Sequence, residues 1–303
     1  MGIIYHQAKM LLDARSHLPM KRVLMIGHLA LCLHPSELQA VRKVCPPGAL
    51  ANYKWGEYAD RFFTECLGVS DVSSLDCSPY EGATIIHDLS QPIPSELKGK
   101  FDVVVEGGTL EHVFNFPIAI ANLMQMTRVG GSIFALTVAN NLCGHGFYQF
   151  SPEIIFRVFT AENGFNLGKV LALCPRFPGI ELVPIRHVFE VADPARVGGR
   201  VGLLTGRPIV LCFDARRTAD LPIFANSPMQ SDYAAAWAGR TRESSLPRWI
   251  TNLAFYPFLR AWLSETSCFQ SFRYWLMGQL QRRECSLNNK RLYKKVEWPK
   301  IEA

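Results

Sequence analysis

Short apolar runs that end in glycine or in a polar residue alternate, in the first half of the chain, with stretches of helical periodicity. The apolar runs have the length of strands buried on both faces and cover residues 22–27, 72–76, 83–89, 101–107 and 132–140. Helices are expected over the first 20 residues, from Pro35 onward, over residues 56–68 and 116–131, and from Ser151–Pro152, a typical N-cap pair. This alternation predicts an α/β fold with a Rossmann-like, doubly wound and mostly parallel sheet.

The carboxyl ends of the expected strands are the places to look for a ligand, because open parallel sheets bind ligands there. Asp76 ends the second strand and can accept hydrogen bonds from both hydroxyls of a ribose. Asp88 ends the third strand and can accept a hydrogen bond from the exocyclic amine of adenine. Each acid alone is equally a turn or cap residue. Together, at successive strand ends, they describe a pocket for an adenosine.

The fourth strand runs into the stretch "KFDVVVEGGTLEHVFNFP", in which Glu106 and Gly107 are followed by Glu111 and His112. Two glycines allow a sharp turn and a close backbone approach to a ligand. Two interpretations stay open. The stretch is either a plain strand-to-helix corner, with Glu111 favoured by a helix dipole, or the lip of an active site. His145, between glycines in "CGHGFYQF", is a second candidate base or a bystander.

The order "VLMIG … SLDCSPYEGA … IIHDLSQPIP … FDVVVEGGTLEHVFN … RVGGSIFALTVANN" resembles class I S-adenosylmethionine-dependent methyltransferases, in particular the methyltransferase-11-like branch. The resemblance covers roughly residues 20 to 170. It implies S-adenosylmethionine as cofactor and methyl transfer to a small-molecule or sugar or glycan acceptor. By the same resemblance Gly27 falls in the first glycine motif. Asp76 would bind the ribose and Asp88 the adenine, Glu106 and Gly107 would border the methionine end, and Glu111 and His112 would stand at the mouth, with His145 as a further catalytic candidate.

The sequence departs from the family at the first glycine motif, where Gly-x-Gly-x-Gly is replaced by "GHLALCL". His28, Leu29 and Ala30 therefore fill positions at which glycines let the backbone approach a cofactor. Asp76 also follows Gly27 by 49 residues, whereas dinucleotide-binding folds place the ribose acid about 20 residues on. The alternative is thus a catalytically inactive binding or scaffold protein on the same fold.

Charge divides the chain into a predicted methyltransferase domain, residues 1–215, and a helical, basic and aromatic C-terminal extension, residues 216–303. The whole chain carries a net charge of +6, and the extension alone holds 14 Lys and Arg against 7 Asp and Glu. Trp, Tyr, Phe and Arg interleave in residues 246–283, which suits a packed helical subdomain or contact with a membrane surface or a protein. The near-neutral catalytic half disfavours a nucleic-acid substrate.

Nine cysteines without a C-x-x-C pair indicate reduced thiols in a cytoplasmic protein. Cysteine and histidine spacing predicts no metal site. The N-terminal residues lack the apolar run and cleavage site of a signal peptide, and no apolar stretch approaches the roughly 20 residues that a membrane-spanning helix needs. Oligomeric state leaves no sign in the sequence.

Overall fold

A computed structural model gives the fold of the chain and describes residues 2–176, 183–239 and 267–297. The chain divides into two compact units. The first comprises residues 1–191, 206–228 and 295–303, and the second comprises residues 192–205 and 229–294. Strand β10 (Ile209–Arg217) runs through the position between residues 215 and 216 at which the sequence analysis divides the chain.

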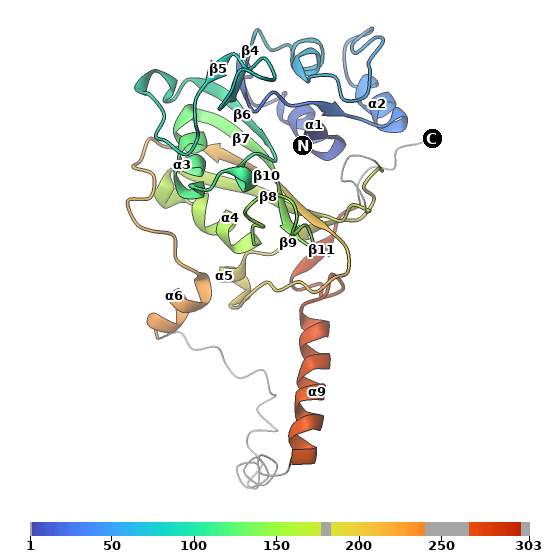
Figure 1. The fold of residues 1–303 in the computed structure, drawn as a ribbon, viewed down its shortest axis with the longest axis vertical. Coiled ribbons are helices and arrows are strands. Elements are labelled where there is room, and N and C mark those ends of the chain that lie inside the picture. The colour runs from blue at the N-terminus through green and yellow to red at the C-terminus, as the bar shows by residue number, and fades with distance from the viewer. Residues whose placement is uncertain (1, 177–182, 240–266, 298–303) are drawn as a thin grey trace. The chain divides into compact units, whose positions relative to one another are not determined.

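The first unit is built on a sheet whose strands lie in the order β9-β8-β10-β7-β6-β2-β4-β5 (Figure 1). The strands not yet given bounds are β2 (Arg22–Ile26), β4 (Asp71–Asp76), β5 (Ile85–Ile86), β6 (Phe101–Gly107), β7 (Thr127–Asn140), β8 (Phe165–Leu173) and β9 (Val188–Val191). The five adjacent strands β5, β4, β2, β6 and β7 are parallel to one another, whereas β10 runs antiparallel to both β7 and β8. The predicted Rossmann-like, mostly parallel sheet is confirmed.

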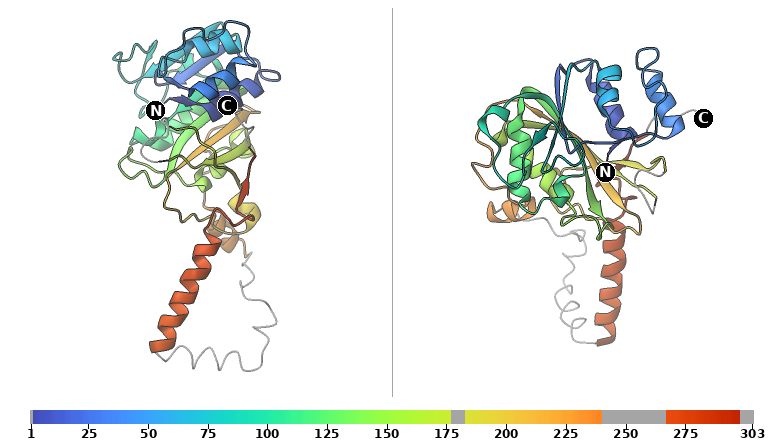
Figure 2. Two further views of the ribbon diagram at one scale, coloured as in Figure 1. Left: turned by 90° about the vertical axis from the view of Figure 1, so that its right-hand side faces the viewer. Right: turned by 45° about the horizontal axis from the view of Figure 1, so that its top comes forward.

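Helices cover both faces of this sheet. The helices α1 (Tyr5–Ala14) and α2 (Pro35–Arg42) lie on one face, and α3 (Phe116–Met126) and α4 (Pro152–Val158) lie on the other (Figure 2). Ala8, Leu11 and Leu12 of α1 are buried in one core cluster with strand residues such as Val23 and Val103, as the helical periodicity predicted. The predicted starts of α2 and α4, each at a proline, are also confirmed.

The order of the strands reverses between β2 and β6. From β2 the chain moves outward to β4 and β5, and it then returns to the other side of β2 to form β6 and β7. The connections leave these two neighbouring strands in opposite directions, so their carboxyl ends, Ile26 and Gly107, stand at the point where the strand order reverses. Ligands of open α/β sheets bind at such a reversal.

Four predicted elements are shorter in the structure. The helix predicted over the first 20 residues comprises only Tyr5–Ala14. The helix predicted over residues 116–131 ends at Met126, and the rest belongs to β7. A Cβ atom on Gly131 would lie 2.6 Å from the carbonyl oxygen of Asp102, so this glycine serves close strand pairing and does not end a helix. The strand predicted over residues 83–89 is reduced to Ile85–Ile86, and the helix predicted over residues 56–68 centres on a π-helical turn, η1 (Phe62–Cys66).

The first residues of the chain are joined to the sheet by polar contacts that the apolar pattern does not show. A short strand, β1 (Ile3–Ile4), pairs in parallel with β3 (Leu31–Cys32). The side chain of Gln7, fully buried in α1, donates from Nε2 to the carbonyl oxygen of Glu106 at 2.7 Å and to that of Phe134 at 3.2 Å. The side chain of Gln7 therefore satisfies carbonyl groups of β6 and β7.

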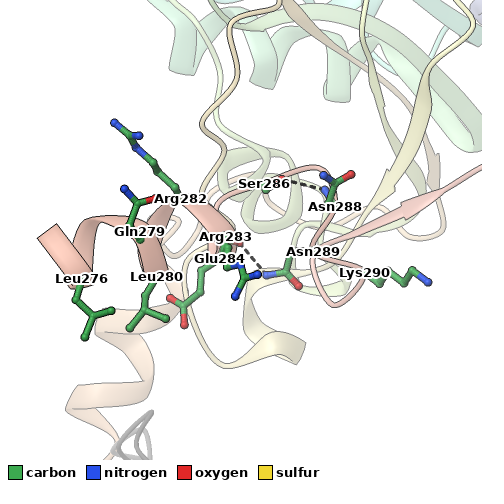
Figure 3. Close-up of a pocket in the computed structure, with 10 residues that line it drawn as sticks. All are labelled: Leu276, Gln279, Leu280, Arg282, Arg283, Glu284, Ser286, Asn288, Asn289 and Lys290. Carbon is green, nitrogen blue, oxygen red and sulfur yellow. Dashed lines mark hydrogen bonds between the residues drawn. The ribbon is translucent and has the colours of Figure 1, made fainter.

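The second unit contains α5 (Pro194–Val197), α6 (Ser231–Trp237) and α9 (Ser267–Glu284). Arg200 pairs with Asp232 at 2.7 Å, and Leu204 N donates to Cys285 O at 2.7 Å. A pocket at the end of α9 is lined by ten residues, of which three are basic, Arg282, Arg283 and Lys290 (Figure 3). Of the predicted C-terminal helices, the part within residues 240–266 lies outside the described residues.

Two further expectations concern the whole chain. Eight of the nine cysteines, those whose side chains the structure describes, are free thiols, as expected. Across the described ranges, no helix combines the length and the apolar character that crossing a bilayer demands.

The buried imidazole of His6 in α1 makes the stability of the fold depend on pH. Burial lowers the pKa of His6 to about 4, from an ordinary value of 6.5. The unfolded chain therefore binds a proton between these two pH values that the folded chain does not bind. Between pH 7 and pH 4, the free energy of unfolding should therefore fall further in the wild type than in His6→Gln. We expect the difference between the two losses to approach roughly 3 kcal/mol, measured by urea unfolding.

The matched control for this experiment is His17→Gln, because the ring of His17 is exposed just beyond the end of the same helix. This variant should follow the pH dependence of the wild type. A His6→Gln variant that lost stability with acid as steeply as wild type would show that His6 protonates freely in the folded protein.

Candidate functional site

The chain leaves β2 through a loop that its side chains hold in place. Gly27 adopts a positive φ of 78°, which explains the glycine at this position. His28 follows, and its Nδ1 lies 2.7 Å from the carbonyl oxygen of Glu81 while its Nε2 lies 2.9 Å from Oδ2 of Asp60. The ring of His28 also stacks on Tyr58 at 3.6 Å between centroids. From there the loop continues as strand β3, so no helix begins at the exit of β2.

Leu29 fills the position at which the family carries a further glycine. Its side chain is 3% exposed and lies against the end of β6, where a Cβ atom on Gly107 would stand 2.8 Å from Leu29 Cδ2. Thr109 crosses the same gap and donates from Oγ1 to the carbonyl oxygen of Ile26 at 3.0 Å. The ends of β2 and β6 are therefore joined by one buried apolar side chain and by one hydrogen bond.

The two acids predicted to bind an adenosine differ in their surroundings. Asp76 ends β4 and is partly buried, and its Oδ1 accepts a hydrogen bond from Ser78 N at 3.2 Å. Asp88 is exposed, and its two carboxylate oxygens accept from the backbone N and the Oγ of Ser90 at 2.8 and 2.7 Å. These hydrogen bonds lower the pKa of Asp88. Asp88 thus has an evident turn-forming role.

Glu106, at the end of β6, has a carboxylate enclosed by the backbone of the turn that follows it. Its Oε1 accepts hydrogen bonds from the N–H groups of Gly108 at 2.7 Å, of Thr109, and of Leu110 at 3.2 Å. The side chain is fully buried, and its Oε2 has no hydrogen-bond partner among the residues that the structure describes. Burial and the neighbouring carboxyl of Glu111 together raise the pKa of Glu106 above its ordinary value.

The turn after Glu106 becomes a single 3₁₀ turn, η3 (Leu110–His112), and presents two of the predicted site residues. Glu111 is fully buried, and its Oε2 accepts from Oγ1 of Thr137 in β7 at 3.1 Å. His112 is exposed, and its ring centroid lies 4.9 Å from that of His145. Burial, followed by the adjacent His145, lowers the pKa of His112. Nε2 of His145 lies 3.6 Å from Oε1 of Glu111.

The structure therefore brings together the three residues that the sequence analysis proposed as catalytic. Glu111 and His112 come from the loop after β6, and His145 comes from the loop after β7, 33 residues further along the chain. We call them the Glu-His-His cluster. Of the remaining candidates, Gly27, Glu106 and Gly107 border the strand reversal, whereas Asp76 and Asp88 follow the two strands beyond β2.

The loop after β7 is held against the loop after β6 by the backbone of Glu111. The N–H groups of Phe147 and Tyr148 donate to the carbonyl oxygen of Glu111 at 2.7 and 3.2 Å, and Tyr148 Oη donates to Phe114 O at 2.7 Å. Gly146 permits this contact, because it has a positive φ of 77° and its Cβ position lies 2.7 Å from the same carbonyl oxygen. The close contact of Gly146 with Glu111 therefore fixes the backbone next to His145.

Sequence reasoning missed several residues on which the site depends, namely Gln7, Thr109, Thr137 and Gly146. Thr137 stands within an ordinary apolar strand, and Gln7 stands within an amphipathic helix, so no local pattern marks either of them. Gly146 did carry a signal, since glycines on both sides of a histidine indicate a backbone that comes close to something else.

The sequence matches no protein-family model and no curated protein. Solved structures similar to this chain include the N-methyltransferase NodS from Bradyrhizobium japonicum, at 13% identity and a TM-score of 0.38 over 71% of this chain and 94% of that one. A S-adenosylmethionine-dependent methyltransferase from Thermotoga maritima, a possible histamine N-methyltransferase, shares 14% identity at a TM-score of 0.38 over 70% and 89%. The methyltransferase CalH, in complex with S-adenosylhomocysteine, shares 14% at 0.37 over 69% and 55%.

Replacing Gly146 by alanine should detach the loop after β7 from Glu111. The new methyl group meets a backbone carbonyl, and the positive φ adds strain of about 1–3 kcal/mol. We expect the amide protons of Phe147 and Tyr148 to exchange with solvent much faster in Gly146→Ala than in wild type, measured by hydrogen exchange and NMR.

Gly144→Ala is the matched control, because nothing lies within 4 Å of a Cβ atom at that position of the same loop. It should leave the exchange of both amides unchanged. Equal protection in wild type and Gly146→Ala would contradict the close contact between the two loops.

Proposed function

We propose that this chain transfers the methyl group of S-adenosylmethionine to a small-molecule acceptor, a class that includes sugars and glycans. The observation that carries the proposal is the reversal of strand order between β2 and β6, with polar side chains gathered at the same edge of the sheet. Glu106 stands at the end of β6, and the Glu-His-His cluster lies in the loops after β6 and β7. Asp76 ends β4 on the other side of the reversal. Such an edge can hold a cofactor beside an acceptor.

The residues at this edge fit the cofactor at its ribose end. Asp76 is partly exposed at the end of β4, so its carboxylate can accept hydrogen bonds from two ribose hydroxyls. Gly27 gives a backbone without a side chain at the exit of β2. Each oxygen of the exposed Asp88 accepts one hydrogen bond from Ser90 and can accept a second, so this carboxylate can also receive the adenine amine.

The methionine end of the cofactor fits beside the end of β6 only if the side chain of Leu29 moves. Its methyl groups lie against Gly107, at the place where a cofactor would approach the end of β6. Leu29 is 3% exposed and belongs to the hydrophobic core cluster, so its side chain can move only if its packing neighbours also shift. This same observation favours the second candidate function, a binding or scaffold protein that keeps the fold without the chemistry.

Once bound, the cofactor supplies a methyl group on a positively charged sulfur. The chain then has to exclude water, position the acceptor and remove its proton, and positioning supplies much of the rate. The imidazoles of His112 and His145 can accept a hydrogen bond from an acceptor hydroxyl or amine and take its proton. Glu111 is buried beside them, with its Oε1 3.6 Å from Nε2 of His145, so its carboxylate can stabilise the charge that the imidazole gains with the proton.

The ribose assignment predicts that Asp76→Ala weakens cofactor binding. Losing a charged acceptor of two hydrogen bonds should cost roughly 1.5–3 kcal/mol, or about ten- to a hundredfold in affinity. Calorimetric titration with S-adenosylmethionine and S-adenosylhomocysteine measures this loss. Asp71→Ala, an exposed acid at the start of the same strand, is the control and should bind as wild type does. Equal affinities for wild type and Asp76→Ala would remove Asp76 from the site.

Leu29→Ala separates the two candidate functions. If Leu29 only narrows an active site, the smaller side chain should raise the affinity for S-adenosylhomocysteine several-fold in the same titration, although the vacated space lowers the stability of the fold. The scaffold function predicts no binding at millimolar ligand in either wild type or Leu29→Ala. A folded Leu29→Ala variant that binds more weakly than wild type would show that Leu29 contributes to cofactor binding.

A further inference from the structure

We propose that Glu111, His112 and His145 bind one divalent transition-metal ion, such as Zn²⁺. The sequence predicted no metal site, because these ligands lie on two loops and show no motif spacing. The fold supplies what the spacing lacks. One nitrogen of each imidazole and one carboxylate oxygen lie within 4.8 Å of one another.

The distances suit a metal site that tightens when the ion enters. Zinc binds nitrogen and oxygen ligands at about 2.0–2.2 Å, which places the ligand atoms roughly 3–4 Å apart. Oε1 of Glu111 and Nε2 of His145 are already 3.6 Å apart. His112 is exposed and His145 lies on a loop, so both rings can close on the buried Glu111 by small rotations.

The carboxylate of Glu111 supplies an independent sign of a cation. Glu111 is 0% exposed, and within the described part of the chain its Oε1 accepts no hydrogen bond, although it lies 3.6 Å from Nε2 of His145. Burying a carboxylate oxygen without a donor is costly, and a bound cation offsets that cost. The other oxygen accepts the hydrogen bond of Thr137, which fixes the carboxylate with Oε1 toward the imidazoles. Metal-binding carboxylates are commonly oriented by such a hydrogen bond.

The donor set indicates which ion would bind. Two imidazole nitrogens and one carboxylate oxygen favour Zn²⁺, Fe²⁺ or Co²⁺ over Mg²⁺ and Ca²⁺, which prefer oxygen ligands. Three protein ligands also leave coordination positions open, as in catalytic zinc sites and in iron sites with two histidines and one carboxylate. The single carboxylate contributes one negative charge against the two positive charges of the ion, and the two imidazoles are neutral. The remaining positive charge favours an anionic oxygen, or a hydroxyl that can lose its proton, at an open coordination position.

This inference goes beyond the proposed methyl transfer and does not require it. The three side chains would bind the ion in a scaffold protein as well as in an enzyme. In an enzyme they would act as ligands and no longer as bases, and the ion would bind the acceptor oxygen and favour loss of its proton.

The test is a calorimetric titration of the full chain, freed of metal by a chelator and dialysis, with Zn²⁺ in the absence of cofactor. Titration with Co²⁺, followed by visible absorption, reports the coordination geometry in parallel. We expect one ion per chain. Glu111→Gln, which keeps the shape of the side chain, and the double variant His112→Ala/His145→Ala should each weaken binding by at least about a hundredfold. Thr137→Val should weaken it by about tenfold.

His17→Gln removes an exposed histidine outside the cluster and should bind the ion as wild type does. Circular dichroism and thermal unfolding establish that each variant is folded. No binding by wild type at millimolar Zn²⁺ would overturn the proposal. So would binding that folded Glu111→Gln and the double histidine variant leave unchanged. Methyl transfer and S-adenosylhomocysteine binding are measured separately, so failure of the metal site and failure of the proposed function give different results.

Discussion

The carboxylate of Glu106, held by three consecutive backbone N–H groups, is the interaction on which the carboxyl edge of the sheet depends. It ends β6 and turns the chain at once into the 3₁₀ turn that carries Glu111 and His112. Glu111 then bonds with its side chain to β7 and with its carbonyl group to the loop that contains His145. The buried carboxylate of Glu106 thus fixes the turn after β6, and through Glu111 this turn also holds the loop after β7.

Opposite this turn, the loop after β2 uses side chains where the resembling family uses glycines. His28 connects the loop to Asp60 and Glu81, and Leu29 packs against Gly107. The loop therefore gains rigidity and loses open space. Leu29 is therefore the residue of this loop that distinguishes the two proposed functions, because its side chain lies against the end of β6.

The sequence predicted the alternation of strands and helices, the two-sided core and the strand ends at which Asp76 and Glu106 stand. These features are local, since each follows from the periodicity of a few residues. The end of α3 and the start of β7 were predicted wrongly because Gly131 is required by the close approach of Asp102, a residue on the neighbouring strand, and does not end a helix. The Glu-His-His cluster was named residue by residue, but its convergence depends on two loops meeting through Gly146 and Glu111, and no single-sequence pattern encodes that contact.

The amide of Gln7 also has a consequence for the order in which the chain acquires its structure. Its two acceptors lie 99 and 127 residues further along the sequence. During synthesis from the amino terminus, α1 therefore cannot complete its polar contacts until both β6 and the middle of β7 have emerged. Contacts of such long range form slowly, because a large loop must close first. Helix α1 is thus locked into the sheet only after β2, β4 and β5, which precede β6 in the chain, have emerged.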